Sequence, residues 1–220
     1  MELIPAKTPK LITSLFPSYV WNIPTKENTI FLTFDDGPTP EVTMWTLDIL
    51  KKFNAKATFF CIGSNIDKHP EIFQSIVNDD HGIGNHTYNH LKGWKTNTKT
   101  YIKDIEKTQD LINKKIRAIN NLDTLNTKLF RPPYGKLIPR QGKALQNLNY
   151  KIIMWNVLSF DWDSSTSKEK CFDNIISNAK RGSIIVFHDS LKASTNLKYC
   201  LPKVLNHFSK MGYTFKSLTL

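Results

Sequence analysis

Two adjacent carboxylates, Asp35 and Asp36, are the first residues in the sequence that could carry chemistry. They stand in the segment 33–38 (TFDDGP), directly after a hydrophobic run. Neighbouring carboxylates repel each other unless a cation or a base neutralises one of them. Asp-Gly is also a common turn dipeptide, so the pair alone fits a solvated turn equally well. A second group of residues is needed to decide between a site and a turn.

Two histidines, His86 and His90, stand four residues apart, so on a helical turn both rings would face the same way and could hold one ion. Together with Asp36 they make three protein ligands and leave room for water and substrate. These donors suit zinc or a neighbouring divalent metal, and the same set describes a non-haem iron site. The other histidines have no such partner, and we expect structural or surface roles for them. They are His69, His81 and His207.

Three more polar residues, Arg131, Asp161 and His188, could complete a site. Arg131 opens the segment 131–135 (RPPYG), in which two prolines stiffen a turn and the guanidinium fork can hold a carboxylate of the Asp pair. His188 ends an apolar run, so its ring should be partly desolvated, and a carboxylate such as Asp161 could tune its proton affinity. Taken alone, His188 would more simply be a satisfied core histidine.

The elements that must position these residues follow from the hydrophobic pattern. Short apolar runs alternate with longer amphipathic stretches, which is typical of repeated strand–helix units. We predict strands at residues 29–34, 57–62, 82–85, 128–131, 151–156, 183–187 and 214–218. We predict helices at residues 41–53, 65–78, 100–119, 140–147, 168–180 and 196–211. Loops are expected at 92–100 and 120–127, and an irregular, proline-containing arm at 1–28. This alternation favours one parallel α/β domain over two domains.

The candidate residues share one position relative to the predicted strands, because each of them lies directly beyond or close after a strand end. In parallel α/β folds the carboxyl ends of the strands carry the active site, since the loops there converge on a rigid edge. A scattered set of surface charges would not repeat this register at several strands. The sequence therefore predicts a single polar site at one edge of the sheet.

Composition narrows the function classes. The 220 residues include 30 Lys and Arg against 19 Asp and Glu, a net charge of +11, and 40% are hydrophobic, which excludes a disordered chain. The lysines are spread along the chain and no nucleic-acid motif is present, so we expect a solvated basic surface and no nucleic-acid partner. The apolar runs reach only strand length, so no membrane span is expected. Residues 1–7 (MELIPAK) lack a secretory signal, which makes a cytoplasmic location the default expectation.

The cysteines of the chain do not indicate a disulfide framework. The three cysteines are odd in number, lie far apart and include no CxxC pair, so we expect free thiols rather than a disulfide or a thiolate zinc site. They are Cys61, Cys171 and Cys200.

Five segments resemble, in order and approximate spacing, the motifs of the polysaccharide deacetylases, the NodB-like carbohydrate esterases of family 4. They are 33–38, 86–90, 131–135, 161–162 and 186–188. The resemblance runs from about residue 29 to the end of the chain. It implies an α/β fold, a distorted (β/α) barrel of about seven parallel strands, in a single catalytic NodB homology domain at 29–220. It also implies a metal-dependent hydrolase that removes acetyl groups from N-acetylated amino sugars.

The resemblance assigns a metal centre and a base. The metal ligands would be Asp36, His86 and His90. The expected cofactor is Zn²⁺, with Co²⁺, Ni²⁺, Mn²⁺ and Fe²⁺ as the alternatives. Asp35 resembles the catalytic base that takes a proton from the attacking water, and Arg131 resembles the residue that orients this base.

The resemblance also assigns the groups that act on the acyl oxygen and on the leaving amine. Tyr134 resembles the residue whose backbone N–H helps to hold the oxyanion. His188 resembles the catalytic acid that protonates the departing amine, and Asp161 its partner. The residues expected to contact the substrate are Pro133, Trp162 and Val186.

Two positions depart from the family pattern. The fourth motif often begins with aspartate where this chain has Leu158, which removes a polar contact at the groove edge. The fifth motif often has leucine where this chain has Val186, which still supplies an apolar wall for an acetyl methyl group. We expect these departures to affect the substrate preference more than the chemistry.

Alternative functions stay open beside deacetylation of peptidoglycan or chitooligosaccharides. The same scaffold could act on another amide, an imide or an acetyl ester such as acetylated xylan, or it could bind glycans without catalysis. An inactive binder usually loses a metal ligand or the base, and this chain retains all of them. A non-haem iron oxygenase would not need the second aspartate, the Arg131 turn and an acid histidine together. The expected partner is an N-acetylated glycan, and we expect a monomer.

Overall fold

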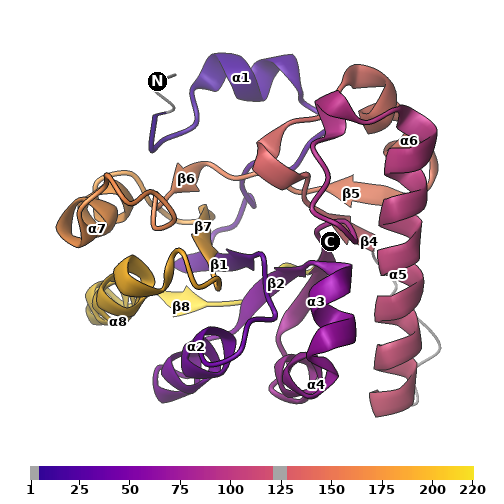
Figure 1. Cartoon of the computed structure of the whole chain (residues 1–220). Helices are drawn as coiled ribbons and strands as arrows, with labels where there is room; N and C mark the ends of the chain where they lie inside the picture. Colours follow the sequence, from indigo (N-terminus) through magenta and orange to yellow (C-terminus); the bar gives the residue numbers. More distant parts are fainter. Residues whose placement is uncertain (1–4, 121–127) are drawn as a thin grey trace.

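The computed structural model describes residues 5–120 and 128–220, and its centre is a curled sheet of parallel strands (Figure 1). The strands are β1 (Thr29–Asp35), β2 (Ala57–Cys61), β3 (Gly82–Asn85), β4 (Lys128–Phe130), β5 (Tyr150–Ile152), β6 (Val157–Leu158), β7 (Ile184–His188) and β8 (Thr214–Phe215). Their order is β5-β4-β3-β2-β1-β7-β6, and β8 pairs with the start of β1. Within the described ranges β5 and β6 do not pair with each other. This open, curled sheet confirms the predicted distorted barrel.

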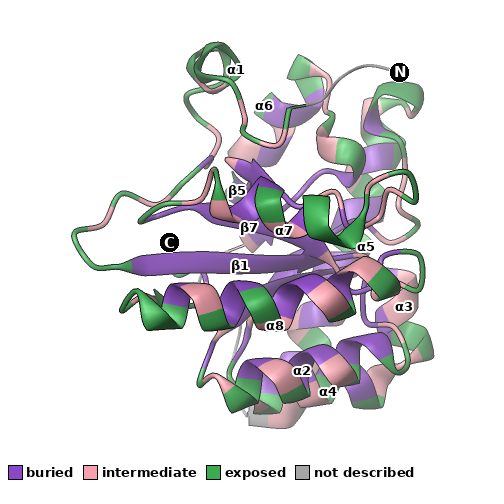
Figure 2. Ribbon diagram, turned by 90° about the vertical axis from the view of Figure 1, so that its left-hand side faces the viewer, coloured by how far each residue is buried: buried purple, intermediate pink, exposed green. Residues whose placement is uncertain are grey.

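The helices are α1 (Lys10–Leu15), α2 (Val42–Lys52), α3 (Gly63–Lys68), α4 (Pro70–Asn78), α5 (Thr98–Asn120), α6 (Pro139–Asn147), α7 (Lys168–Ile176) and α8 (Ser194–Lys210), with 3-10 turns η1 (Gly93–Lys95) and η2 (Pro133–Gly135). Helices from α2 to α8 surround the outer face of the sheet, whereas α1 lies apart from them (Figure 1). Buried residues of α8 alternate with exposed ones, as expected for a helix packed on a sheet by one face (Figure 2). Over the described residues, no helix is both long and apolar enough to cross a bilayer.

The central strand β1 aligns the residues of the site. All seven of its residues are buried, because strands flank it on both sides and helices cover the sheet. Stacked rings of Phe34, Phe59 and Phe187 join β1 to its neighbours β2 and β7. In the ladder between β1 and β7, Asp35 stands opposite His188. The fold therefore brings two distant sequence motifs side by side.

One predicted strand is split, and the break has a physical cause. The strand predicted at 151–156 is two strands, β5 and β6. Between them the carbonyl oxygens of Ile153 and Met154 accept hydrogen bonds from the Arg131 side chain, at 3.2 and 3.0 Å, instead of continuing a ladder. The break in the strand thus forms the socket of a buried arginine.

Other element predictions differ mainly at their ends. The helix predicted at 65–78 is two helices, because Pro70, which lacks a backbone N–H, begins α4 directly after α3 has ended. The helix predicted at 168–180 ends at Ile176, and the strand predicted at 214–218 ends at Phe215. The loop predicted at 92–100 contains η1 and the start of α5. The loop predicted at 120–127 falls, apart from its first residue, outside the described residues.

The predicted irregular arm has more structure than the sequence indicated. It contains the short helix α1, and three of its residues form isolated bridges, Lys7 with Val157, Val20 with Ile153 and Asn22 with Ser183. The first two partners lie in the stretch from the end of β5 to β6, so this part of the arm runs along the open side of the sheet. The three cysteines are buried and free, as predicted.

Candidate active site

The carboxyl ends of the strands surround a cavity of about 520 Å³. Predicted site residues that line it are Asp35, Asp36, His86, His90, Tyr134, Trp162, Val186 and His188. Arg131 and Asp161 are buried behind this wall. Pro133, which we expected to contact the substrate, is buried in the turn, and its neighbour Pro132 lines the cavity instead. The structure thus brings residues of all five motifs together.

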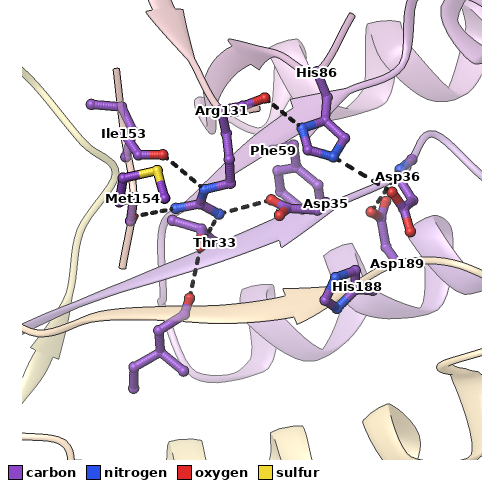
Figure 3. Close-up of polar contacts among 12 residues, drawn as sticks. Thr33, Asp35, Asp36, Phe59, His86, Arg131, Ile153, Met154, His188 and Asp189 are labelled. Atoms are coloured by element: carbon purple, nitrogen blue, oxygen red, sulfur yellow. Dashed lines mark hydrogen bonds and ion pairs between the residues drawn. The ribbon is translucent and has the colours of Figure 1, made fainter. Parts of the chain in front are cut away.

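The first carboxylate, Asp35, is fixed by the buried guanidinium of Arg131 (Figure 3). Arg131 Nη1 donates to Asp35 Oδ1 at 2.8 Å and to Thr33 Oγ1 at 2.7 Å. With the two main-chain carbonyls between β5 and β6, every nitrogen of the guanidinium has an acceptor. The guanidinium carbon also lies 4.1 Å from the centre of the Phe60 ring. Since the position of its guanidinium is fixed in this way, Arg131 holds the Asp35 carboxylate oriented toward the cavity.

The second carboxylate, Asp36, faces both histidines of the second motif. Asp36 Oδ1 lies 3.7 Å from His86 Nε2 and 3.3 Å from His90 Nε2, and one ligand atom from each residue lies within 4.8 Å of the others. His86 Nδ1 lies 2.8 Å from the Arg131 carbonyl oxygen, so it must carry the proton that it donates there. The lone pair of His86 is therefore on Nε2, which faces Asp36. This is the donor set and the tautomer that a divalent cation requires.

Protonation states at this cluster also suit a cation. Burial lowers the pKa of His86 to about 4, so the ring is neutral at physiological pH. For Asp36, burial opposes ionisation, but a hydrogen bond from His90 and the charge of His188 hold its pKa well below the usual range. A neutral imidazole and an ionised carboxylate bind a divalent metal without first releasing a proton.

The backbone of the second motif differs from the predicted helical turn. His86 and His90 lie in a loop, in which Thr87 and His90 have φ values of 65° and 52°. The buried Asn85 side chain holds this loop, because its Oδ1 accepts from the Thr87 N–H and its Nδ2 donates to the Ile105 carbonyl. The rings still come together, with centroids 5.1 Å apart. Left-handed backbone at non-glycine residues is costly and is often retained at functional sites.

A second carboxylate–histidine pair lies across the cavity. His188 Nδ1 donates to Asp161 Oδ1 at 2.8 Å, and the His188 backbone N–H donates to Asp161 Oδ2 at the same distance. Burial would lower the pKa of His188, but the charge of Asp161 and its hydrogen bond raise it to about 9. The Trp162 ring packs 4.7 Å from the His188 ring and stacks on Phe160. His188 is therefore a protonated acid whose Nε2 is the nitrogen left for a substrate.

The turn after β4 presents a backbone donor. Tyr134 has a φ of 60°, and in the described part of the chain its backbone N–H donates to no acceptor, whereas those of Gly135 and Lys136 bond within the turn. A Cβ on Gly135 would lie 2.4 Å from the Trp155 ring, so the turn also needs glycine there. The Tyr134 N–H can therefore bind an oxygen of a substrate, as the resemblance implies.

Asp189 stands with His188 at the end of β7, and the sequence assigned it no role in the site. Its Oδ1 accepts from the Gly37 N–H at 3.0 Å, and its Oδ2 accepts from the Thr43 hydroxyl at 2.6 Å. Burial, with a contribution from the charge of Asp36, raises its pKa to about 7. A Cβ on Gly37 would lie 2.0 Å from Asp189 Oδ2, so only glycine fits there. Asp189 thus fixes the turn that carries Asp36, and its place directly after His188 was the available signal.

The two departures from the family pattern lie side by side. Leu158 of β6 stands opposite Val186 of β7 in the ladder, and both residues line the cavity. They form one apolar patch of its wall. Trp155, Ser190 and Lys192 also line the cavity, and no sequence pattern pointed to them.

Comparisons with known proteins find similar sequences and similar folds. Residues 22–153 match the model of a family described as polysaccharide deacetylase. A peptidoglycan-N-acetylglucosamine deacetylase of Bacillus cereus is 35% identical over 205 residues, which cover 91% of this chain and 70% of that protein. The peptidoglycan-N-acetylmuramic acid deacetylase PdaA of Bacillus subtilis is 32% identical over 196 residues, covering 88% and 71%. The crystal structure of the Bc1960 peptidoglycan N-acetylglucosamine deacetylase matches with a TM-score of 0.85 at 33% identity, over 96% of this chain and 95% of that one.

Proposed function

Because the chain belongs to the polysaccharide deacetylase family, hydrolases that act on carbon–nitrogen bonds, we propose that it removes N-acetyl groups from amino sugars of peptidoglycan or of a chitooligosaccharide. The observation that carries this proposal is that a carboxylate and an imidazole, two groups that can exchange protons with a substrate, line the same cavity. Asp35 is held by Arg131, and His188 is held by Asp161. An ionised carboxylate and a protonated imidazole are the base and the acid that amide hydrolysis needs.

We propose that Asp36, His86 and His90 hold a divalent cation, with Zn²⁺ first because it prefers imidazole and carboxylate donors. A cation bound there would polarise the amide carbonyl and lower the pKa of a water molecule. The ionised Asp36 and the neutral His86 support this assignment.

The chain's own residues then divide the proton transfers. Asp35 takes the proton of the water that attacks the acetyl carbon. The Tyr134 N–H donates to the oxyanion of the tetrahedral intermediate. His188 gives the proton on Nε2 to the sugar nitrogen, which would otherwise be too poor a leaving group. The apolar patch of Leu158 and Val186 offers a wall for the acetyl methyl group.

Incubation of the zinc-loaded protein with chitooligosaccharides and with peptidoglycan fragments tests the proposal. We expect release of acetate and the appearance of free amines, measured by mass spectrometry. The variants Asp35→Asn and His188→Ala should each lower kcat by about 10²- to 10⁴-fold, the usual contribution of an acid or a base.

The matched controls are Asp48→Asn on α2 and His207→Ala on α8, which do not line the cavity and should keep full activity. If zinc-loaded protein releases no acetate from any of these substrates, the assignment of the reaction is wrong. If the two site variants remain fully active, the assigned base and acid are wrong.

A further inference from the structure

The two histidines of the second motif are held in different ways. The ring of His86 is anchored on the protein, because its Nδ1 donates to the Arg131 carbonyl oxygen at 2.8 Å. The ring of His90 faces Asp36 and packs 4.8 Å from the ring of Tyr134. In the described part of the chain, however, the His90 ring bonds to no main-chain carbonyl. The position of His90 must therefore come from the backbone that carries it.

That backbone, residues 87–89, is held on one side by the start of helix α3. The Gly63 N–H donates to the Thr87 carbonyl at 2.9 Å. The Ser64 N–H donates to the Tyr88 carbonyl at 3.0 Å. These bonds satisfy the carbonyls of the loop, and its buried N–H groups need acceptors from another element.

One carboxylate on helix α5, that of Asp104, accepts from the N–H groups of the loop. Asp104 Oδ2 accepts from the Tyr88 N–H at 2.6 Å and from the Asn89 N–H at 3.1 Å. Asp104 Oδ1 accepts from the side-chain amide of Asn89 at 2.6 Å. Asp104 is buried, and among the described residues it forms no ion pair. Its oxygens are therefore used on the two residues directly before His90.

The hydrogen bonds of Asp104 act where the backbone of the loop is strained. Thr87 and His90 both have left-handed backbone, with φ values of 65° and 52°, which costs free energy in residues other than glycine. Tyr88 and Asn89 lie between them. Without the bonds to Asp104 the loop can relax toward ordinary backbone, and such a relaxation turns the His90 ring away from Asp36.

We propose that Asp104 is a positioning residue that presents His90 to the cation. It contacts neither the cavity nor the other two proposed ligands, so it acts only through the loop. Helix α5 then contributes to metal affinity, although none of its residues is a ligand. The proposal rests on the metal site of the proposed function, and it adds the group that holds one of the ligands.

Zinc affinity, measured by titration calorimetry, is the first test. We expect Asp104→Ala to weaken zinc binding by about 10- to 100-fold, the usual effect of removing a group that orients a metal ligand. Asp104→Asn keeps an oxygen for the two backbone N–H groups, and a turned Asn89 amide restores the third bond. This variant should therefore retain most of the affinity. Equal losses in the two variants would overturn the proposal.

The matched control is Ile112→Ala, which removes a buried side chain from the same helix two turns later. It leaves a cavity in the core and destabilises the protein without touching the loop. Urea denaturation compares the stability of the variants, and zinc is titrated where all of them are folded. The control should keep the zinc affinity of the wild type. A loss as large as that of Asp104→Ala would mean that the stability of α5, and not the contact of Asp104, decides metal binding.

Crystal structures of the metal-free wild type and of metal-free Asp104→Ala separate this proposal from the proposed function. In the variant we expect the His90 ring to leave Asp36, whereas the His86 ring stays on the Arg131 carbonyl. If the wild type binds no zinc but the His90 ring moves in the variant, only the assignment of the metal site is wrong. If the His90 ring keeps its place, Asp104 does not position it, whatever the zinc affinity.

Discussion

Burial and a neighbouring carboxylate act in opposite directions on His188. Burial favours the neutral ring, and the charge and hydrogen bond of Asp161 outweigh it, so the pKa rises from its ordinary 6.5 to about 9. Because the folded pKa is the higher one, the stability that this ion pair contributes is fully present below about pH 6.5 and is lost as pH rises through about 9. The proton that we propose His188 gives to the departing amine is lost over the same upper range.

Removal of the Asp161 charge should therefore be visible in the pH dependence of the reaction. We expect Asp161→Asn to shift the alkaline limb of the kcat/KM profile to lower pH by at least about one unit. The variant loses the negative charge that favours the protonated His188 ring, and even a modest loss of that attraction lowers the pKa by about one unit. A cation at Asp36 adds positive charge near His188, so the alkaline limbs of the wild type and of the variant should both lie below pH 9. The control is Asp163→Asn, a neighbouring change of equal charge away from the His188 ring. An unmoved limb in Asp161→Asn would contradict the role of His188 as the acid.

Individual site residues could be predicted where the sequence places them at strand ends. Asp35, Asp36 and His188 follow apolar runs, and the ladder aligns the first of them with the last. Asp189 lies at the same strand end as His188, but its role could not be predicted, because it depends on contacts with Gly37 and Thr43, which are distant in the sequence. Pro133 is buried in the turn, and its predecessor lines the cavity, a difference of one residue that the sequence does not reveal. The substrate contact of Pro133 stays a prediction.

Helix α2 is tied to the site through one hydroxyl. The Thr43 hydroxyl donates to Asp189, whereas that of Thr46, one turn later, donates to the carbonyl of Val42 within the helix. Both side chains are fully buried. Replacing each threonine by valine therefore distinguishes the loss of the hydrogen bond to Asp189 from a general effect on the stability of the helix.

We expect Thr43→Val to destabilise the protein by about 1–3 kcal/mol, because it leaves a buried carboxylate oxygen without a donor. Thr46→Val should stay within about 0.5 kcal/mol of the wild type, since the Val42 carbonyl is shared with the helix backbone. Urea denaturation measures both. Zinc affinity should fall in the first variant only, because Asp189 fixes the turn that carries Asp36. Equal effects of the two variants would mean that Asp189 does not depend on Thr43.

Among the elements, strands and long helices could be predicted from the hydrophobic pattern, and breaks could not. The split between β5 and β6 depends on a guanidinium from a distant part of the chain, which takes the carbonyls of Ile153 and Met154. The break between α3 and α4 could have been predicted, since Pro70 cannot continue a helix. The arm was underestimated because its bridges to Val157 and Ile153 are long-range contacts.

At the scale of the whole molecule, metal binding should be linked to stability. A ligand at 100 times its Kd that binds only the folded state adds about 2.7 kcal/mol, which for a chain of this size raises Tm by about 5–10 °C. We expect zinc to give such a shift, measured by calorimetry, and EDTA to reverse it.

Two histidine variants show whether this shift comes from the proposed ligands. His86→Ala should abolish the response to zinc, whereas His69→Ala, which changes a histidine outside the cluster, should keep it. A wild-type Tm that does not respond to any divalent ion would contradict the metal site.

The single catalytic domain, the monomeric state and the location of the protein stay predictions.

During synthesis, a ribosome releases β1 and β2 long before β7. In the finished sheet, however, β1 lies between β2 and β7. Until β7 has emerged, one edge of a strand whose residues all become buried exposes unpaired backbone groups, the type of edge that invites pairing with another chain. Asp35 and His188 cannot come into register before that moment. The nascent protein therefore acquires its proposed base and acid together, and loses this unpaired edge, only when nearly the whole chain has been translated.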